Sequence, residues 1–130
     1  MAVWSFMDYV DDRRRNVMRE WIESLPPHVR TDVRSRLNAR IDTSAGQAVL
    51  GPPQMKLLHG DCEGLIEITF KVANVQYRPL ACHGPDEHQV TILMGAREHN
   101  KRFEPPNACA TALARAARIH EEGKVVSHEY

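Results

Sequence analysis

Three stretches in the middle of the chain alternate apolar and polar residues, and together they predict an antiparallel sheet. They are residues 64–70, 75–78 and 88–94. Alternation with a period of two is typical of a strand that buries one face and exposes the other. Ala73-Asn74 favours a tight turn between the first two stretches, and Gly84-Pro85-Asp86 favours another before the third. The three strands are therefore predicted to form a meander.

Strand parity divides this meander into an apolar face and a polar face. The apolar face is expected to contact helices, and it carries Ile66, Ile68, Phe70, Tyr77, Ala81, Val90, Ile92 and Met94. The polar face carries Glu67, Thr69, Lys71, Gln76, Arg78, Gln89, Thr91 and, if the last strand continues, Arg97. Antiparallel sheets commonly have one packed face and one solvated face. Any binding site is therefore expected on or beside the polar face.

Apolar residues before the meander recur at helical spacing and predict a pair of helices. The first spans about residues 11–24, with Val17, Met18, Trp21 and Ile22 on one side, and it ends at Pro26-Pro27. In the second, apolar residues recur every four positions, at Val29, Val33, Leu37 and Ile41. Because the link is so short, the two should form an antiparallel hairpin. Residues 3–7 are β-prone and predict a first strand.

The remaining segments are a loop, a helix and a tail. Residues 43–54 contain Ser, Gly and Pro and predict a loop. Pro105-Pro106 opens an alanine-rich helix, and the polar tail from about residue 121 is expected to be frayed. The whole chain is interpreted as one α+β domain.

Composition limits the classes of protein that this chain can belong to. Its 130 residues suffice for one core, and 42% hydrophobic and 26% charged residues are ordinary values. Formal net charge is zero, so nucleic-acid binding would need a local patch. No apolar run is long enough for a membrane span, and the N-terminus does not resemble a signal peptide. The three cysteines, widely spaced, favour reduced thiols in the cytoplasm over a disulfide framework.

Two surface features have competing interpretations. Residues 1–42 hold eight arginines interleaved with seven acidic residues, which favours a solvated helix surface over a phosphate-binding one. Cys62, Cys82-His83 and His88 do not match the spacing of a standard zinc site, so no metal or other cofactor is expected. Cys109 lacks a partner that would make it a nucleophile.

A series of short motifs follows this order of elements. They are Lys56-Leu57-Leu58, Gly64-Leu65-Ile66-Glu67-Ile68, Tyr77-Arg78, Ile92-Leu93-Met94-Gly95 and Asn100-Lys101-Arg102 before Pro105. In order and spacing the chain resembles the RelE/ParE toxin superfamily, nearest its phage-derived HigB-like branch, from about residue 4 to residue 119. The resemblance implies a small curved antiparallel sheet with an N-terminal helix hairpin and a C-terminal helix packed on it.

The resemblance also implies a function and partners. RelE-like and HigB-like members are toxins of type II toxin–antitoxin systems that cleave mRNA on the ribosome without a metal and are silenced by an antitoxin. By position, Arg78 matches the arginine of the family's Tyr-Arg pair, and Arg97 and His99 join it as expected catalytic residues on chemical grounds, for phosphate binding and for proton transfer. Lys56, Lys101 and Arg102 are the expected RNA-binding residues. The expected partners are an antitoxin, mRNA and the ribosome, in the cytoplasm and not at a membrane.

Elementary chemistry supports these roles and keeps a second function open. Metal-free RNA cleavage needs a base, an acid and cations around the phosphate, which His99 and the arginines can supply. Alternatively, His99 is a surface histidine and Arg78 pairs with Glu67 across the strands. Thr69 stands where many HigB-like relatives have arginine. That departure favours a non-catalytic binding protein on the same fold, either a ParE-like gyrase inhibitor or a phage-borne protein with a decayed site.

Overall fold

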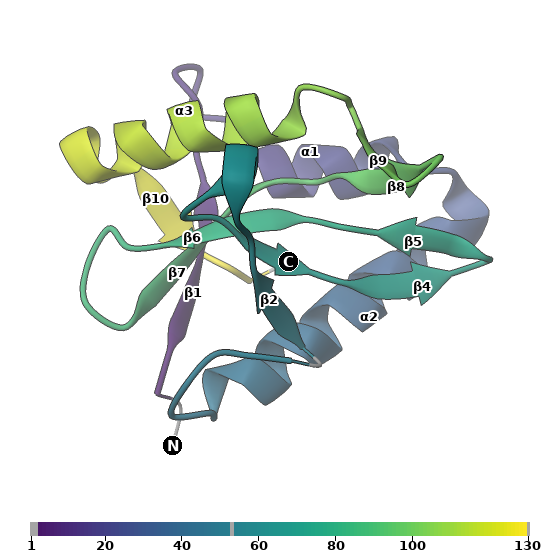
Figure 1. Ribbon diagram of the computed structural model, residues 1–130, viewed down its shortest axis with the longest axis horizontal. Helices are drawn as coiled ribbons and strands as arrows, with labels where there is room; N and C mark the ends of the chain where they lie inside the picture. The colour runs from purple at the N-terminus through teal and green to yellow at the C-terminus, as the bar shows by residue number, and fades with distance from the viewer. Residues whose placement is uncertain (1–2, 53, 130) are drawn as a thin grey trace.

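The computed structural model describes residues 3–52 and 54–129, which form an α+β domain with helices on both sides of a strongly bent sheet (Figure 1). The helical segments are α1 (Val17–Ser24), α2 (Pro27–Ala45), the short 3₁₀ turn η1 (Gly60–Cys62) and α3 (Ala108–Glu122). The strands are β1 (Ser5–Tyr9), β2 (Met55–Leu57), β3 (Ile66–Ile68), β4 (Phe70–Val72), β5 (Val75–Tyr77), β6 (Leu80–His83), β7 (Gln89–Met94), β8 (Arg97–His99), β9 (Arg102–Glu104) and β10 (Val125–Ser127).

The strands of the described residues form two sheets, and three segments of the chain run from one sheet into the other. The larger sheet has the order β10-β1-β7-β6-β3-β2, and the smaller has the order β4-β5-β8-β9. β1 runs parallel to β7, and the other neighbouring strands are antiparallel. One or two residues separate β3 from β4, β5 from β6 and β7 from β8, so each pair is one bent strand. The predicted meander is confirmed, and it extends through both sheets.

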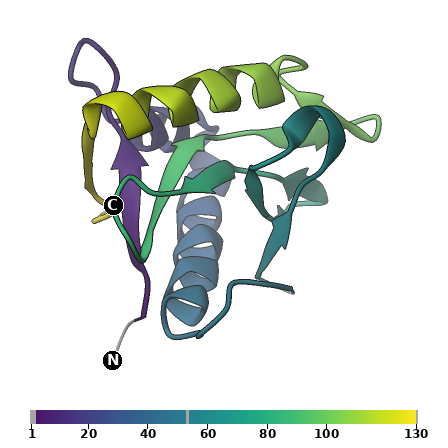
Figure 2. The ribbon, with the colours of Figure 1, turned by 60° about the vertical axis from the view of Figure 1, so that its left-hand side comes forward.

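Helices cover both faces of the larger sheet (Figure 2). α1 and α2 bury Met18, Ile22, Val33 and Leu37 against the face that carries Ile68. On the opposite face, α3 packs on a second cluster that includes Leu65, Leu80, Leu93, Ala108, Ala112 and Ile119. The small alanine side chains of α3 allow it to approach the strands closely. The expectation of a fully solvated polar face is therefore wrong for this sheet, where Glu67 is 4% exposed and Thr91 is fully buried.

One extra residue in β7 changes which residues lie on each face. Ala81 pairs with Ile92, but Leu80 pairs with Met94, which leaves Leu93 without a partner in β6. Such a bulge reverses the alternation of side chains beyond it. The predicted apolar-face residues before the bulge lie in the α1–α2 core as expected. Met94 instead lies in the α3 cluster, so its predicted placement was wrong.

The helix hairpin is close to its predicted form. α1 begins later than expected, at Val17, because the Asn16 side chain accepts a hydrogen bond from the Arg19 amide and caps the helix there. The preceding turn is fixed by the Asp11 carboxylate, which accepts the backbone amides of Arg13 and Arg15. α2 begins at Pro27, since a proline, which lacks an N–H, suits the first turn of a helix.

The C-terminal tail is ordered, which contradicts the predicted fraying. Gly123, with φ of 66°, ends α3, and β10 then pairs antiparallel with β1. His128 is held between Asp8 and Asn38, with Nδ1 2.8 Å from the Asp8 carboxylate and Nε2 2.7 Å from the Asn38 side-chain oxygen. One polar side chain of the tail, that of His128, therefore contacts a buried carboxylate.

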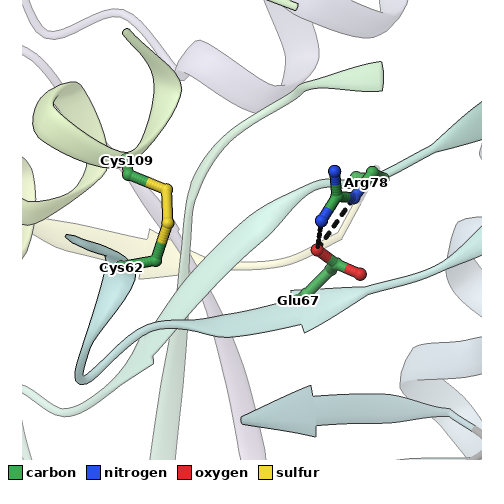
Figure 3. The surroundings of a disulfide bond; sticks show 4 residues. All are labelled: Cys62, Glu67, Arg78 and Cys109. Carbon is green, nitrogen blue, oxygen red and sulfur yellow. Dashed lines mark hydrogen bonds and ion pairs between the residues drawn. A yellow bond between two sulfur atoms is a disulfide. The ribbon is translucent and has the colours of Figure 1, made fainter. Parts of the chain in front are cut away.

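Cys62 and Cys109 form a disulfide that ties η1 to the first turn of α3 (Figure 3). Their Cα atoms are 5.2 Å apart although 47 positions separate them in the sequence. The prediction of reduced thiols was therefore wrong for this pair, because sequence spacing does not reveal contacts made by folding. Cys82 remains a free, buried thiol. Among the described residues, no helix combines the length and apolar character needed to cross a bilayer.

Candidate nucleic-acid interface

The predicted basic loop after the meander is a β-hairpin made of β8 and β9. Asn100 and Lys101 form its turn, both with positive φ, at 51° and 64°. Arg97 pairs with Glu104 and His99 pairs with Arg102, whereas Glu98 pairs with Phe103. Cross-strand partners project to the same side, and successive residues to opposite sides. One face, called the hairpin face below, therefore carries Arg97, His99, Arg102 and Glu104.

The hairpin face combines three basic side chains with one carboxylate. Glu104 Oε2 lies 3.2 Å from Arg97 Nη2 and 3.9 Å from His99 Nδ1. The Arg97 and His99 side chains remain 45% and 66% exposed. Arg102 is exposed, and in the described part of the chain no carboxylate lies within ion-pair distance of it. The hairpin face therefore carries the His99 imidazole beside the guanidiniums of Arg97 and Arg102, and that of Arg97 already forms an ion pair with Glu104.

Two grooves meet at the hairpin face. One, of about 620 Å³, is lined by Arg97, His99, Arg102 and Phe103 among others. The second, of about 630 Å³, also includes Arg97 and Glu104 and continues to the α1–α2 turn, where Trp21 and His28 line it. Because they share residues, the grooves form one surface with a basic end and an aromatic end.

The aromatic end depends on a ring cluster between α1 and the smaller sheet. Trp21 and Tyr77 lie edge to face with ring centroids 6.0 Å apart, and Tyr77 stacks on Phe70 at 5.6 Å. Tyr77 is 4% exposed, so the prediction that it belongs to the core is confirmed. The sequence assigned Trp21 to the apolar stripe of a helix and gave no signal that it also lines a groove.

Arg78 lies on the other side of the smaller sheet. Its Nε and Nη2 donate to Glu67 Oε2 at 2.9 and 2.6 Å (Figure 3), and its guanidinium lies 3.8 Å from the centroid of the Phe103 ring. The Arg78 side chain is 17% exposed and that of Glu67 is 5% exposed. The sequence left two roles open for Arg78, a catalytic residue or an arginine paired with Glu67. The observed contacts are those of the pair with Glu67.

The structure brings together only part of the predicted site. Arg97, His99 and Arg102 share the hairpin face, and Lys101 is exposed at the hairpin turn. Arg97 pairs with Tyr77, so the bulge in β7 has placed it on the face opposite Arg78, and the expected shared face was wrong. Lys56 lies on β2 beside Glu67, on the exposed outer edge of the larger sheet.

The described residues offer neither a reactive cysteine nor a cluster of metal ligands. Cys82 is 3% exposed, and desolvation raises the pKa of its thiol to about 12, so the reactive thiolate is scarce at neutral pH. Within residues 3–52 and 54–129, no group of three or more His, Cys, Asp or Glu side chains is arranged to hold a metal ion.

Comparison of the chain with protein-family models, with curated proteins and with solved structures finds no match. No relative therefore supplies roles for the residues of the hairpin face. Their function has to be inferred from their chemistry and from the sequence pattern.

Proposed function

We propose that the protein is a toxin of the RelE/HigB-like kind, a cytoplasmic, ribosome-dependent mRNA endoribonuclease that works without a metal and is silenced by an antitoxin. The observation that carries this proposal is the hairpin face, where His99 lies between Arg97 and Arg102 at an open groove. These are the group types that RNA cleavage needs, an acid or base for proton transfer and cations for the phosphate.

The arrangement supports a division of roles on the hairpin face. Arg102 binds the scissile phosphate with its planar fork of N–H donors, and Arg97 adds positive charge while Glu104 holds its orientation. His99 transfers a proton to or from the reacting oxygen. Glu104, 3.9 Å from Nδ1, stabilises the protonated imidazole electrostatically in that step. Lys101 contacts a neighbouring phosphate at the hairpin turn.

The aromatic end of the groove supports binding of single-stranded RNA. A base that leaves the hairpin face toward α1 meets Trp21, and stacking on an aromatic ring is worth about 1–3 kcal/mol per base. Arg78 is a positioning residue in this scheme, because its ion pair with Glu67 and its contact with Phe103 fix the hairpin to β3. An antitoxin that inserts acidic side chains into the basic groove would block both ends at once.

A second candidate, a non-catalytic binding protein on the same fold, is favoured by two observations. Arg78 and Arg97 are both paired with carboxylates, which reduces the positive charge available to a phosphate. Structural disulfides such as Cys62–Cys109 are also rare in cytosolic proteins, which weighs against an activity on cytoplasmic ribosomes and favours a partner outside the cytosol. In this alternative the hairpin face and the groove bind a protein partner.

Primer extension on mRNA from a purified translation system tests the proposal. Added protein should cut the mRNA inside its translated region, and an otherwise identical mRNA without a start codon should stay intact. Cutting should persist with a zinc-selective chelator that leaves the ribosomal magnesium in place. If folded wild-type protein produces no cuts and Thr69→Arg is equally silent, the nuclease function is excluded and the binding protein remains.

A further inference from the structure

A separate cavity lies between α3 and the loop that follows β1. In Figure 1 this loop, drawn in purple, rises beside α3. The cavity measures about 590 Å³ and shares no lining residue with the groove at the hairpin face. Its lining comes from the end of β1, the loop and α3, and comprises Tyr9, Asp11, Asp12, Arg13, Arg15, Thr111, Ala114, Arg115 and Arg118.

The two carboxylates of the cavity are already neutralised by arginines. Asp11 accepts Arg15 Nε at 2.9 Å, and Asp12 forms an ion pair with Arg118. The backbone amide of Arg15 contributes most to lowering the pKa of Asp11, and the side chain of Arg118 contributes most to lowering that of Asp12. Glu20 and Glu122 approach the same two arginines from outside the cavity, with carboxylate oxygens 3.9 Å from Arg15 Nε and 3.6 Å from Arg118 Nη2. Of the four lining arginines, Arg13 and Arg115 are therefore the two that form no ion pair among the described residues.

Arg115 is fixed in place without a counter-ion. Its Nη1 donates to the Leu93 carbonyl at 2.8 Å, and its guanidinium lies 5.3 Å from the centroid of the Tyr9 ring. The side chain is half-buried, and among the described residues no carboxylate lies within ion-pair distance of it. A partly desolvated charge of this kind is stabilised by an anion that accepts its remaining N–H donors.

We propose that this cavity binds a small phosphate monoester, with the Arg115 fork as its anchor, Arg13 as a second cation and the Thr111 hydroxyl as a neutral donor. The two guanidiniums without an ion pair can face the two charges of a monoester dianion, whereas a phosphodiester carries one negative charge. The volume lies in the range of sites for small organic ligands and exceeds the needs of inorganic phosphate alone. The proposal is independent of RNA cleavage at the hairpin face.

Titration of the intact, disulfide-bonded protein with defined phosphates tests the site by NMR and calorimetry. The probes are inorganic phosphate, a nucleoside 5′-monophosphate, a dinucleoside phosphodiester, and one short RNA with and without a 5′-phosphate. The monophosphate should shift the amides of residues 11–15 and 111–118 at lower concentrations than any shift of residues 97–104, which report on the hairpin face. Its affinity for the cavity should rise as pH increases through about 6, where a phosphate monoester loses its second proton. Shifts of residues 11–15 and 111–118 by the RNA only when it carries the 5′-phosphate would identify an RNA end as a source of the same group.

Single substitutions distinguish specific binding of the phosphate in this cavity from general attraction of an anion to a basic surface. Arg115→Gln should weaken monophosphate binding by about 10- to 100-fold, the usual effect of losing hydrogen bonds to a charged group. Arg115→Lys should weaken it nearly as much, because the fork is lost although the charge is kept. Arg13→Gln, at an exposed position, should weaken binding without affecting folding. Arg36→Gln, which removes the same charge from the exposed side of α2, should have no effect.

Several results would overturn the proposal. They are absence of amide shifts at millimolar monophosphate, equal affinity for the phosphodiester, and equal weakening by Arg36→Gln and Arg13→Gln. If Arg115→Gln fails to fold, the Arg13→Gln variant and the shift map of the wild type still decide the question.

Discussion

At the scale of single residues, the absence of a side chain at Gly95 shapes the candidate interface. The Trp21 indole lies directly on this glycine, and any Cβ there would overlap the ring. The same ring lies edge to face with Tyr77 and lines the aromatic end of the groove. One missing methyl group therefore allows α1 to approach β7 closely enough to place Trp21 beside the smaller sheet.

This contact predicts the effect of adding one carbon. Gly95→Ala should lower the free energy of unfolding by about 1–3 kcal/mol, because the indole has to move out of a close-packed site. Denaturant unfolding followed by tryptophan fluorescence measures the change. Gly51→Ala is the control, since the space around that position is open. Equal stability of the two variants would show that Trp21 does not pack on Gly95.

The three cysteines predict a distinct pattern of chemical labelling. The native, unreduced protein should not react with a maleimide at neutral pH, because Cys82 is buried with a pKa raised to about 12 and the other two are joined. Unfolding without reduction should release one reactive thiol, and unfolding with reduction should release three. Mass spectrometry counts the labels. Three labels on unfolded, unreduced protein would show that the disulfide does not form.

At the scale of elements, β10 closes the larger sheet over a buried contact between His128 and Asp8. His128 and Asp8, with side chains 6% and 0% exposed, connect this strand to β1, and Asn38 connects it to α2. Without β10, β1 would be an unpaired edge strand, which is a site of unwanted pairing between chains. The C-terminal segment therefore completes the fold.

Replacement of His128 by alanine should lower the free energy of unfolding. His128→Ala leaves the Asp8 carboxylate buried with only Asn16 as a side-chain donor, and breaking a buried pair in this way typically costs about 3–5 kcal/mol. Thermal or chemical unfolding measures the loss, and the exposed Glu129→Ala is the neighbouring control. A variant as stable as the control would mean that the contact between His128 and Asp8 does not stabilise the fold.

The elements also show which features can be predicted from sequence. The α1–α2 hairpin, the turn at Ala73-Asn74 and the meander follow from local periodicity and turn chemistry, and they were predicted correctly. The bulge at Leu93 has no local signal, because it arises from pairing between β6 and β7. It is also what separates Arg97 from Arg78. The disulfide and β10 likewise depend on residues distant in sequence, so periodicity could not reveal them.

At the scale of the whole molecule, the helices leave part of the smaller sheet accessible. α1 and α2 cover one face of the larger sheet and α3 covers the other, and the hairpin of β8 and β9 lies past the end of α3 (Figure 1). Its basic face and the adjoining aromatic groove are therefore a part of the sheet that a large ligand can reach. The cavity beside the end of β1 is a separate surface with its own cations.

The most direct test compares the rates at which two adjacent variants cleave mRNA on translating ribosomes under single-turnover conditions. His99 lies on the hairpin face, whereas Glu98 points to the opposite face, where its carboxylate lies 3.9 Å from Arg78 Nη1. Both side chains are exposed, and a long ion pair at an exposed carboxylate contributes little stability, so neither substitution should affect folding. We expect His99→Ala to slow cleavage by about 10²–10⁴, the usual contribution of acid–base catalysis, and Glu98→Ala to cleave like the wild type. Equal rates for the two variants, or a folded wild type that cuts no mRNA, would contradict the proposed nuclease function.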